Sequence, residues 1–147
     1  MSEYQEFDIL MAEDNAKDAE MTERALRKHN LANRLHWVRD GVEALDYIYC
    51  RGAYAGRDAR RAPRLLLLDL KMPRMDGIEV LRTLKADERM RAIPVVVMTS
   101  SNEERDVVES YRLGVNSYIV KPIDFAAFFD VVIKVGLYWV LANRVPE

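Results

Sequence analysis

Short apolar segments alternate with stretches of helical periodicity along the chain. Five short segments are rich in Leu, Ile, Val or aromatic residues, which is typical of buried strands. They are Phe7–Ala12, Leu35–Val38, Arg64–Leu70, Pro94–Thr99 and Ser117–Val120. The stretches that follow them repeat apolar residues every three or four positions, which indicates helices packed by one face. The sequence therefore predicts five strand–helix units in series.

This alternation is typical of α/β proteins, in which helices cover both faces of a parallel sheet. The segment Arg64–Leu70 holds four consecutive Leu residues, which predicts a strand buried on both faces. Right-handed crossovers between parallel strands leave few topologies. We therefore expect an α/β fold with a doubly wound, five-stranded parallel sheet of strand order 2-1-3-4-5.

Two of the predicted helices begin with capping signals. Asp40 is followed three positions later by Glu43, and Ser101 is followed by Glu104 in a capping-box pattern. The last helix is expected from about Asp124 towards Asn143 and is unusually apolar. Packing on the sheet uses one stripe of such a helix, about half of its apolar residues.

The chain length predicts one domain over residues 1–147, because domains commonly have ~100–150 residues. Two segments extend beyond the repeating units. Residues 51–63 are rich in Gly, Ala and Arg, and we expect a long surface loop there. Residues 124–147 are expected to form an extended C-terminal helix and tail.

Composition and charge exclude several classes of protein. Charged residues make up 31% of the chain and hydrophobic residues 50%, which excludes a disordered chain. The longest uncharged stretch, Ala92–Asn102, is far shorter than the ~20 residues of a spanning helix, and the acidic N-terminus is no signal peptide. The net charge is −2, so neither nucleic acid nor a membrane is an expected partner. With Cys50 as the single cysteine, a reducing cytoplasm is the expected location.

Polar side chains stand at the carboxyl ends of the predicted strands, where parallel sheets bind ligands. Glu13 and Asp14 follow the first strand, Asp69 ends the third, Thr99 ends the fourth and Lys121 follows the fifth. Each has a structural explanation when taken alone, such as a helix cap at the acidic pair. Together they suit Mg²⁺, which prefers oxygen ligands, and a carboxylate that attacks a phosphoryl group. An ammonium and a hydroxyl nearby can stabilise or sense the phosphoryl oxygens.

These residues resemble the receiver domain of two-component response regulators. The family pattern D-x-x-M-P-x-M-D-G is matched throughout by Asp69–Gly77, DLKMPRMDG, and the resemblance extends over Phe7 to Lys134. It implies a flavodoxin-like receiver fold that is no enzyme beyond Mg²⁺-dependent gain and loss of a phosphoryl group at one aspartate. The first acidic residue, Glu13, replaces the commoner Asp. The inserted residues 51–63 lengthen the chain between the acidic pair and Asp69.

The resemblance assigns roles residue by residue. It implies that Asp69 is the phosphoacceptor, assisted by Thr99 and Lys121, and that Thr99 and Tyr118 are the switch residues. It implies Mg²⁺ as the cofactor, held by Glu13, Asp14, Asp69 and the backbone carbonyl of Lys71. The Lys121–Pro122 bond is expected to be cis.

A narrower resemblance concerns partners. Asn15, Ser100, the long loop and the C-terminal Tyr-Trp segment are similar to single-domain regulators that partner bacterial phytochrome kinases. This implies a stand-alone response regulator whose partner is a sensor histidine kinase, a bacteriophytochrome among the candidates. The apolar last helix and tail predict a homodimer, with a helix packed only on its own sheet as the alternative.

Three other functions stay open at this point. The protein could be a receiver-like scaffold that acts without phosphorylation, or an intermediate in a phosphorelay. A phosphohydrolase with an aspartyl phosphate intermediate is disfavoured, because such enzymes carry a second Asp two positions after the nucleophile. Here that position is Lys71.

Overall fold

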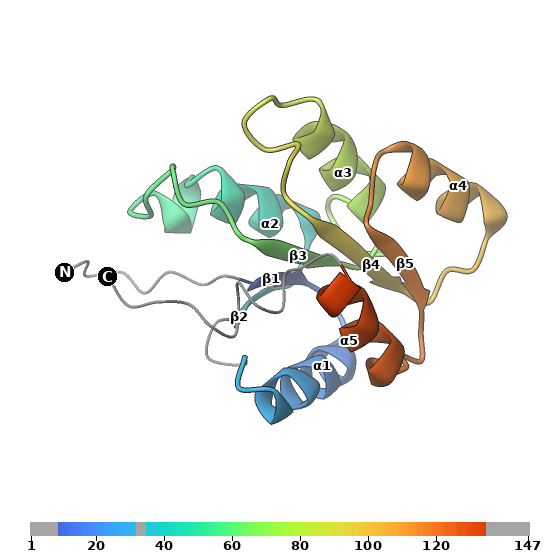
Figure 1. Ribbon diagram of the computed structural model, residues 1–147. Coiled ribbons are helices and arrows are strands. Elements are labelled where there is room, and N and C mark those ends of the chain that lie inside the picture. Colours follow the sequence, from blue (N-terminus) through green and yellow to red (C-terminus); the bar gives the residue numbers. More distant parts are fainter. Residues whose placement is uncertain (1–8, 32–34, 135–147) are drawn as a thin grey trace.

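The computed structural model describes residues 9–31 and 35–134. Its centre is a sheet of five parallel strands in the order β2-β1-β3-β4-β5, as predicted (Figure 1). The strands are β1 (Ile9–Ala12), β2 (Leu35–Val38), β3 (Leu65–Leu68), β4 (Val95–Thr99) and β5 (Ser117–Val120). Each lies within its predicted segment.

Helices cover both faces of the sheet. Figure 1 shows α1 and α5 on one face and α2, α3 and α4 on the other. Their bounds are α1 (Ala16–Lys28), α2 (Gly41–Ile48), α3 (Gly77–Lys85), α4 (Glu104–Arg112) and α5 (Phe125–Lys134). In the described part of the chain, no helix is long and apolar enough to cross a membrane.

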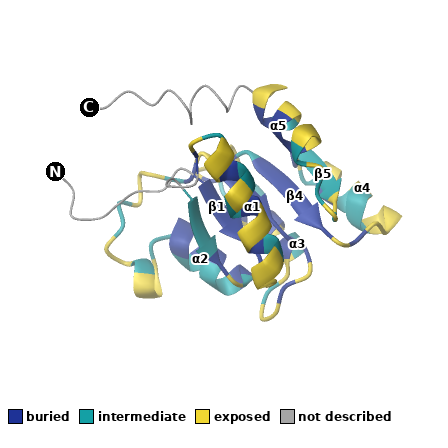
Figure 2. Ribbon diagram, turned by 90° about the horizontal axis from the view of Figure 1, so that it is seen from below, coloured by how far each residue is buried: buried dark blue, intermediate teal, exposed yellow. Residues whose placement is uncertain are grey.

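The strand β3 divides the core into two layers. Leu66 and Leu68 pack with α2 and α3, whereas Leu65 and Leu67 pack with α1 and α5. All four are buried, as are the central strands β1 and β4 in Figure 2. The run of four Leu residues is therefore explained by alternation in a strand that faces a core on both sides.

The structure confirms one of the two predicted helix caps and contradicts the other. Asp40 caps α2 by accepting a hydrogen bond from the backbone N–H of Glu43 at 2.8 Å. The predicted capping box at Ser101 is wrong, because α4 begins at Glu104 after a Glu103 cap that has no side-chain bond. The Ser101 hydroxyl instead contacts the Asp106 carboxylate at 2.5 Å.

The long loop at residues 51–63 is held against the sheet edge by a polar and aromatic cluster. The hydroxyl of Tyr54, in a short 3₁₀ turn, donates to Glu43 at 2.7 Å and contacts His36 Nε2 at 2.9 Å. The Arg57 guanidinium lies over the Tyr47 ring and bonds to the Tyr47 carbonyl. We call these five residues the loop anchor.

The last helix is described only as far as Lys134. Phe128, Phe129 and Val132 are buried against the sheet, while Ile133 is 58% exposed. The predicted continuation towards Asn143, and the tail to residue 147, lie outside the described residues.

Candidate functional site

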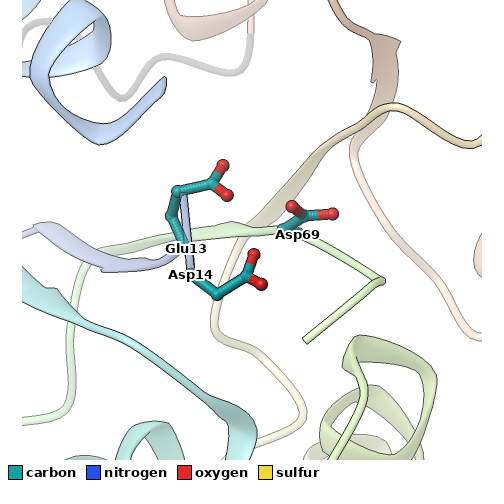
Figure 3. Close-up of side chains that lie close together, drawn as sticks. All are labelled: Glu13, Asp14 and Asp69. Carbon is teal, nitrogen blue, oxygen red and sulfur yellow. The ribbon is translucent and has the colours of Figure 1, made fainter. Parts of the chain in front are cut away.

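Three carboxylates converge at the carboxyl ends of β1 and β3. Figure 3 shows Glu13, Asp14 and Asp69 pointing towards a common space, and one oxygen of each lies within 4.8 Å of the others. Glu13 and Asp69 are buried, whereas Asp14 is exposed. The site is therefore open to solvent on one side.

Backbone hydrogen bonds fix the two buried carboxylates. Glu13 continues the ladder to β2, and its side chain accepts from the backbone N–H of Asn15 at 3.2 Å. The Trp37 indole donates to the Glu13 carbonyl at 2.7 Å. Asp69 accepts from the backbone N–H of Lys71 at 3.1 Å. The helix cap at α1 is Asn15, not the acidic pair, so Glu13 and Asp14 are free of the capping role.

Lys121, the residue directly after β5, joins this group. Its ammonium lies 2.6 Å from Glu13, 3.1 Å from Asp69 and 2.8 Å from Asp18 in the first turn of α1. Sequence reasoning missed Asp18. Its position in the first turn of the helix that follows the acidic pair is the signal that would have included it. We call Glu13, Asp14, Asp18, Asp69 and Lys121 the acid cluster.

Burial and crowding change the protonation of the acid cluster. Burial raises the pKa of Glu13 to about 7, with the charge of Asp69 adding to the effect and the hydrogen bond from Lys121 opposing it. Burial alone would lower the pKa of Lys121, but hydrogen bonds to Asp18 and Glu13 outweigh it, and the pKa is raised. Lys121 therefore stays a cation, while Glu13 holds a proton readily.

The hydroxyl predicted to act as a switch lies at the end of β4. Thr99 is fully buried, and its Oγ1 accepts from the backbone N–H of Ser101 at 3.3 Å. The Tyr118 hydroxyl donates to the Ser101 carbonyl at 2.8 Å. The backbone N–H of Lys121 donates to the Thr99 carbonyl at 2.8 Å, and the Lys121–Pro122 bond is cis, as expected. Thr99, Tyr118 and Lys121 are thus linked through adjacent strand ends.

The loop after Asp69 packs closely against the first residues of α2 and α3. The Arg74 guanidinium makes two hydrogen bonds to Asp40, at 2.9 and 3.0 Å, and its backbone has φ of 65°. Gly41 donates to the Met75 carbonyl, which a Cβ at position 41 would overlap. A Cβ at Gly77 would overlap the carbonyl of Asp69. Both helix starts therefore require glycine for this close approach.

The donor set of the site fits a hard divalent cation. Carboxylate oxygens are the ligands such ions prefer, and the exposed side at Asp14 leaves room for bound water. Softer metals are disfavoured because no His or Cys belongs to this group. A divalent cation would also offset the repulsion between Glu13 and Asp69.

Comparison with known proteins decides the family. The model of the response regulator receiver domain matches residues 9–133. The chain belongs to the response regulator receiver family. The receiver resemblance and the fold predicted with it are therefore confirmed, and this family is one of signalling domains in two-component systems rather than of conventional enzymes.

Individual relatives of this receiver are regulators of similar length. It is 41% identical over 140 residues to the probable methanogenesis regulatory protein FilR2 of Methanothrix harundinacea, covering 95% of this chain and 88% of that one. The bacteriophytochrome response regulator RtBRR has a similar structure, with TM-score 0.82, 43% identity, and coverage of 97% of this chain and 86% of that one. The Mn(2+)-bound form of Rcp1, a response regulator of Synechocystis, has TM-score 0.75, 34% identity, and coverage of 95% and 98%.

Proposed function

We propose that this receiver is a stand-alone response regulator that accepts a phosphoryl group on Asp69 from a histidine kinase. The observation that carries this proposal is the convergence of Glu13, Asp14 and Lys121 on the Asp69 carboxylate at the end of β3. A buried carboxylate between metal-binding oxygens and an ammonium can attack phosphorus while neighbouring positive charge stabilises the phosphoryl oxygens.

The transfer needs no other protein group to form or break bonds. An oxygen of Asp69 bonds to the phosphorus atom of a phosphohistidine, and the P–N bond breaks with its electron pair on the imidazole, which takes a proton from solvent. In hydrolysis, a water oxygen later bonds to the phosphorus and loses a proton to solvent, while the O–P bond breaks with its electron pair on the carboxylate and inorganic phosphate leaves. Lys121 is placed to hold a phosphoryl oxygen because its ammonium already lies 3.1 Å from Asp69.

Mg²⁺ is the proposed cation, held by Glu13, Asp14, Asp69 and the backbone carbonyl of Lys71. The carboxylate cluster supports this choice, and the Rcp1 relative is known in a Mn(2+)-bound form. When bound, the cation would neutralise charge on the transferring phosphoryl group.

Thr99 and Tyr118 are the proposed switch. A phosphoryl group on Asp69 offers new acceptor oxygens to the Thr99 hydroxyl, whose present neighbour is the N–H of Ser101. Tyr118 is bonded to the carbonyl of the same Ser101, so movement of this segment would change both contacts. Phosphorylation then favours one of two conformers, and the α4–β5 side presents a different surface.

The test is the intact mass of the protein after incubation with Mg²⁺ and acetyl phosphate. We expect a single phosphoryl adduct in the wild type and none in Asp69→Asn or without Mg²⁺. The matched control is Asp76→Asn, which changes an exposed carboxylate of the same loop and keeps a side chain able to cap α3. An adduct on Asp69→Asn, or none on the wild type, would refute the proposal.

For the partner, the similarity to RtBRR supports a bacteriophytochrome histidine kinase. Phosphoryl transfer from such a kinase, autophosphorylated with ATP, should label the wild type and leave Asp69→Asn unlabelled. Labelling by unrelated kinases at the same rate would argue against this pairing.

A homodimer through the last helix and the C-terminal tail is the proposed assembly. Ile133 is an exposed apolar residue on α5, and Val131, two positions earlier, is half-buried. Light scattering of Ile133→Asp should give the monomer mass under conditions in which the wild type gives the dimer. Val108→Asp, which removes an exposed apolar residue from α4 instead, is the control. A monomeric wild type would contradict the dimer.

A further inference from the structure

Asp18 differs from the other carboxylates that contact Lys121. An ammonium has three N–H donors, and those of Lys121 face three carboxylates at 2.6, 2.8 and 3.1 Å. The contact to Asp18 is shorter than that to Asp69. Glu13 and Asp69 follow strands, whereas Asp18 lies on α1, so the ion pair joins α1 to the end of β5.

The backbone of Asp18 is fixed independently of its carboxylate. Its N–H donates to the Asn15 side chain at 3.1 Å, and its carbonyl accepts from the Thr22 hydroxyl at 3.1 Å. The Asp18 side chain is 35% exposed, so burial does not force it towards Lys121. The ion pair itself therefore accounts for this orientation.

The position of Asp18 matters because it lies outside the three-carboxylate group. Glu13 and Asp69 belong to that group and would share their charge with a bound cation, which repels the Lys121 ammonium. Asp18 is absent from it and keeps its full charge for Lys121. In the cation-loaded site, Asp18 is then the partner best able to hold the ammonium near Asp69.

A small cavity with mostly apolar walls borders this ion pair. Asp18 and Lys121 line a space of about 80 Å³ whose other walls include Met21, Met98 and Phe125. Apolar walls strengthen the attraction between opposite charges.

We propose that Asp18 is a positioning residue that anchors the Lys121 ammonium beside Asp69 while a cation occupies the neighbouring carboxylates. This inference rests on the proposed role of Asp69 as phosphoacceptor. An ammonium already in place requires less reorganisation when charge develops on the phosphoryl oxygens. Asp18 thereby speeds phosphoryl transfer without touching the phosphoryl group.

The first test measures the rate of adduct formation from acetyl phosphate at saturating Mg²⁺. Asp18→Asn should slow it about tenfold, the effect of losing one charge-assisted hydrogen bond. Asp18→Glu should restore most of the rate, because its carboxylate still reaches Lys121. Glu20→Gln is the matched control, since it removes one exposed charge from α1 that pairs with Arg24 instead. Its rate should equal that of the wild type.

The second test observes the ammonium of Lys121 directly by NMR, with Mg²⁺ present. Its ¹⁵Nζ signal should be visible in the wild type and in Glu20→Gln, where hydrogen bonding slows proton exchange, and lost in Asp18→Asn. If Asp18→Asn kept the wild-type rate and the Lys121 signal, or was phosphorylated faster, the role of Asp18 would be refuted while the proposed function would stand. A wild type that gains no adduct would overturn the proposed function as well, so the two failures are distinguishable.

Discussion

The acid cluster and the loop anchor are both partly buried polar groups, but they differ in charge balance. In the acid cluster, three carboxylates share the ammonium of Lys121, and a fourth, Asp14, lies beside them. In the loop anchor, Glu43 and Arg57 balance each other. Burial lowers the pKa of His36, which keeps the imidazole of the loop anchor neutral at pH 7.

This difference in charge balance distinguishes a cluster suited to bind a cation from one that only stabilises the fold. An excess of negative charge is costly in the empty protein and is relieved when a cation arrives. A cluster whose charges balance has no such repulsion for a cation to relieve. The loop anchor therefore fixes residues 51–63 to the sheet edge, whereas the acid cluster is set to respond to its ligand.

The largest effect on stability is expected from Lys121→Met, which increases the excess of negative charge in the acid cluster. Removing the ammonium leaves buried carboxylates unpaired, which should lower the free energy of unfolding by about 3 kcal/mol at pH 8 without Mg²⁺. Saturating Mg²⁺ should recover most of this loss. Urea unfolding with EDTA and with Mg²⁺ measures both values. Lys134→Met, at an exposed site on α5, is the control, and an equal loss with and without Mg²⁺ would contradict the comparison.

A pH change tests the same excess of negative charge, because it changes the protonation of Glu13. Its pKa of about 7 in the folded protein exceeds the ordinary 4.5, so the folded state binds more protons between these values. Without Mg²⁺, stability should therefore fall as the pH rises from 4.5 to 7. Mg²⁺ requires the ionised carboxylate, so its affinity should fall about tenfold per pH unit below 7.

Calorimetric titration at pH 6 and pH 8 checks this prediction. In buffers of different ionisation enthalpy, binding at pH 6 should release close to one proton. Glu13→Gln should bind Mg²⁺ more weakly and lose the pH dependence. Equal affinity of the wild type at both pH values would show that Glu13 does not titrate in this range.

A smaller effect is expected from Tyr54→Phe in the loop anchor. The change removes the contacts to Glu43 and His36 and should cost about 1 kcal/mol of stability. Because this cluster is balanced, the loss should be the same with and without Mg²⁺, and phosphorylation should be unchanged. Tyr49→Phe, which removes a hydroxyl hydrogen bond to Asp87 outside both clusters, is the matched control. A loss that Mg²⁺ reverses would show that the two clusters are coupled.

The smallest effect is expected from Asp40→Asn, where a balanced ion pair lies next to the Asp69 loop. Asn still caps α2, so the change isolates the ion pair with Arg74, whose side chain is 59% exposed. The loss of stability should stay below about 1 kcal/mol, and the Mg²⁺ affinity should change less than about twofold. A large loss of Mg²⁺ affinity would assign this ion pair to the binding site.

Much of the fold could be predicted because its signals are local. Four consecutive Leu residues require burial on both faces, and the strand–helix alternation then restricts the topology. The carboxyl ends of parallel strands lie at one edge of the sheet, so the strand positions alone predicted that Glu13, Asp14, Asp69 and Lys121 lie close together.

What could not be predicted depends on contacts distant in sequence. The Ser101–Glu104 spacing satisfied the capping pattern, but Ser101 is buried and contacts Asp106. Cys50, just after α2, is half-buried and has φ of 56°, a backbone conformation that no local sequence signal predicts. Residues 51–63 were expected as a surface loop, and their anchoring through Tyr54 depends on a histidine 18 residues earlier.

The two glycines beside the Asp69 loop have a consequence for how such a protein can diversify. Positions 41 and 77 admit no side chain without displacing the loop backbone, so the segment between Asp69 and Gly77 is held in one shape from both sides. Residues 51–63 carry exposed positions with no such constraint. Evolutionary change, or a designed library, can therefore vary the exposed positions of residues 51–63 while the segment after Asp69 stays almost invariant.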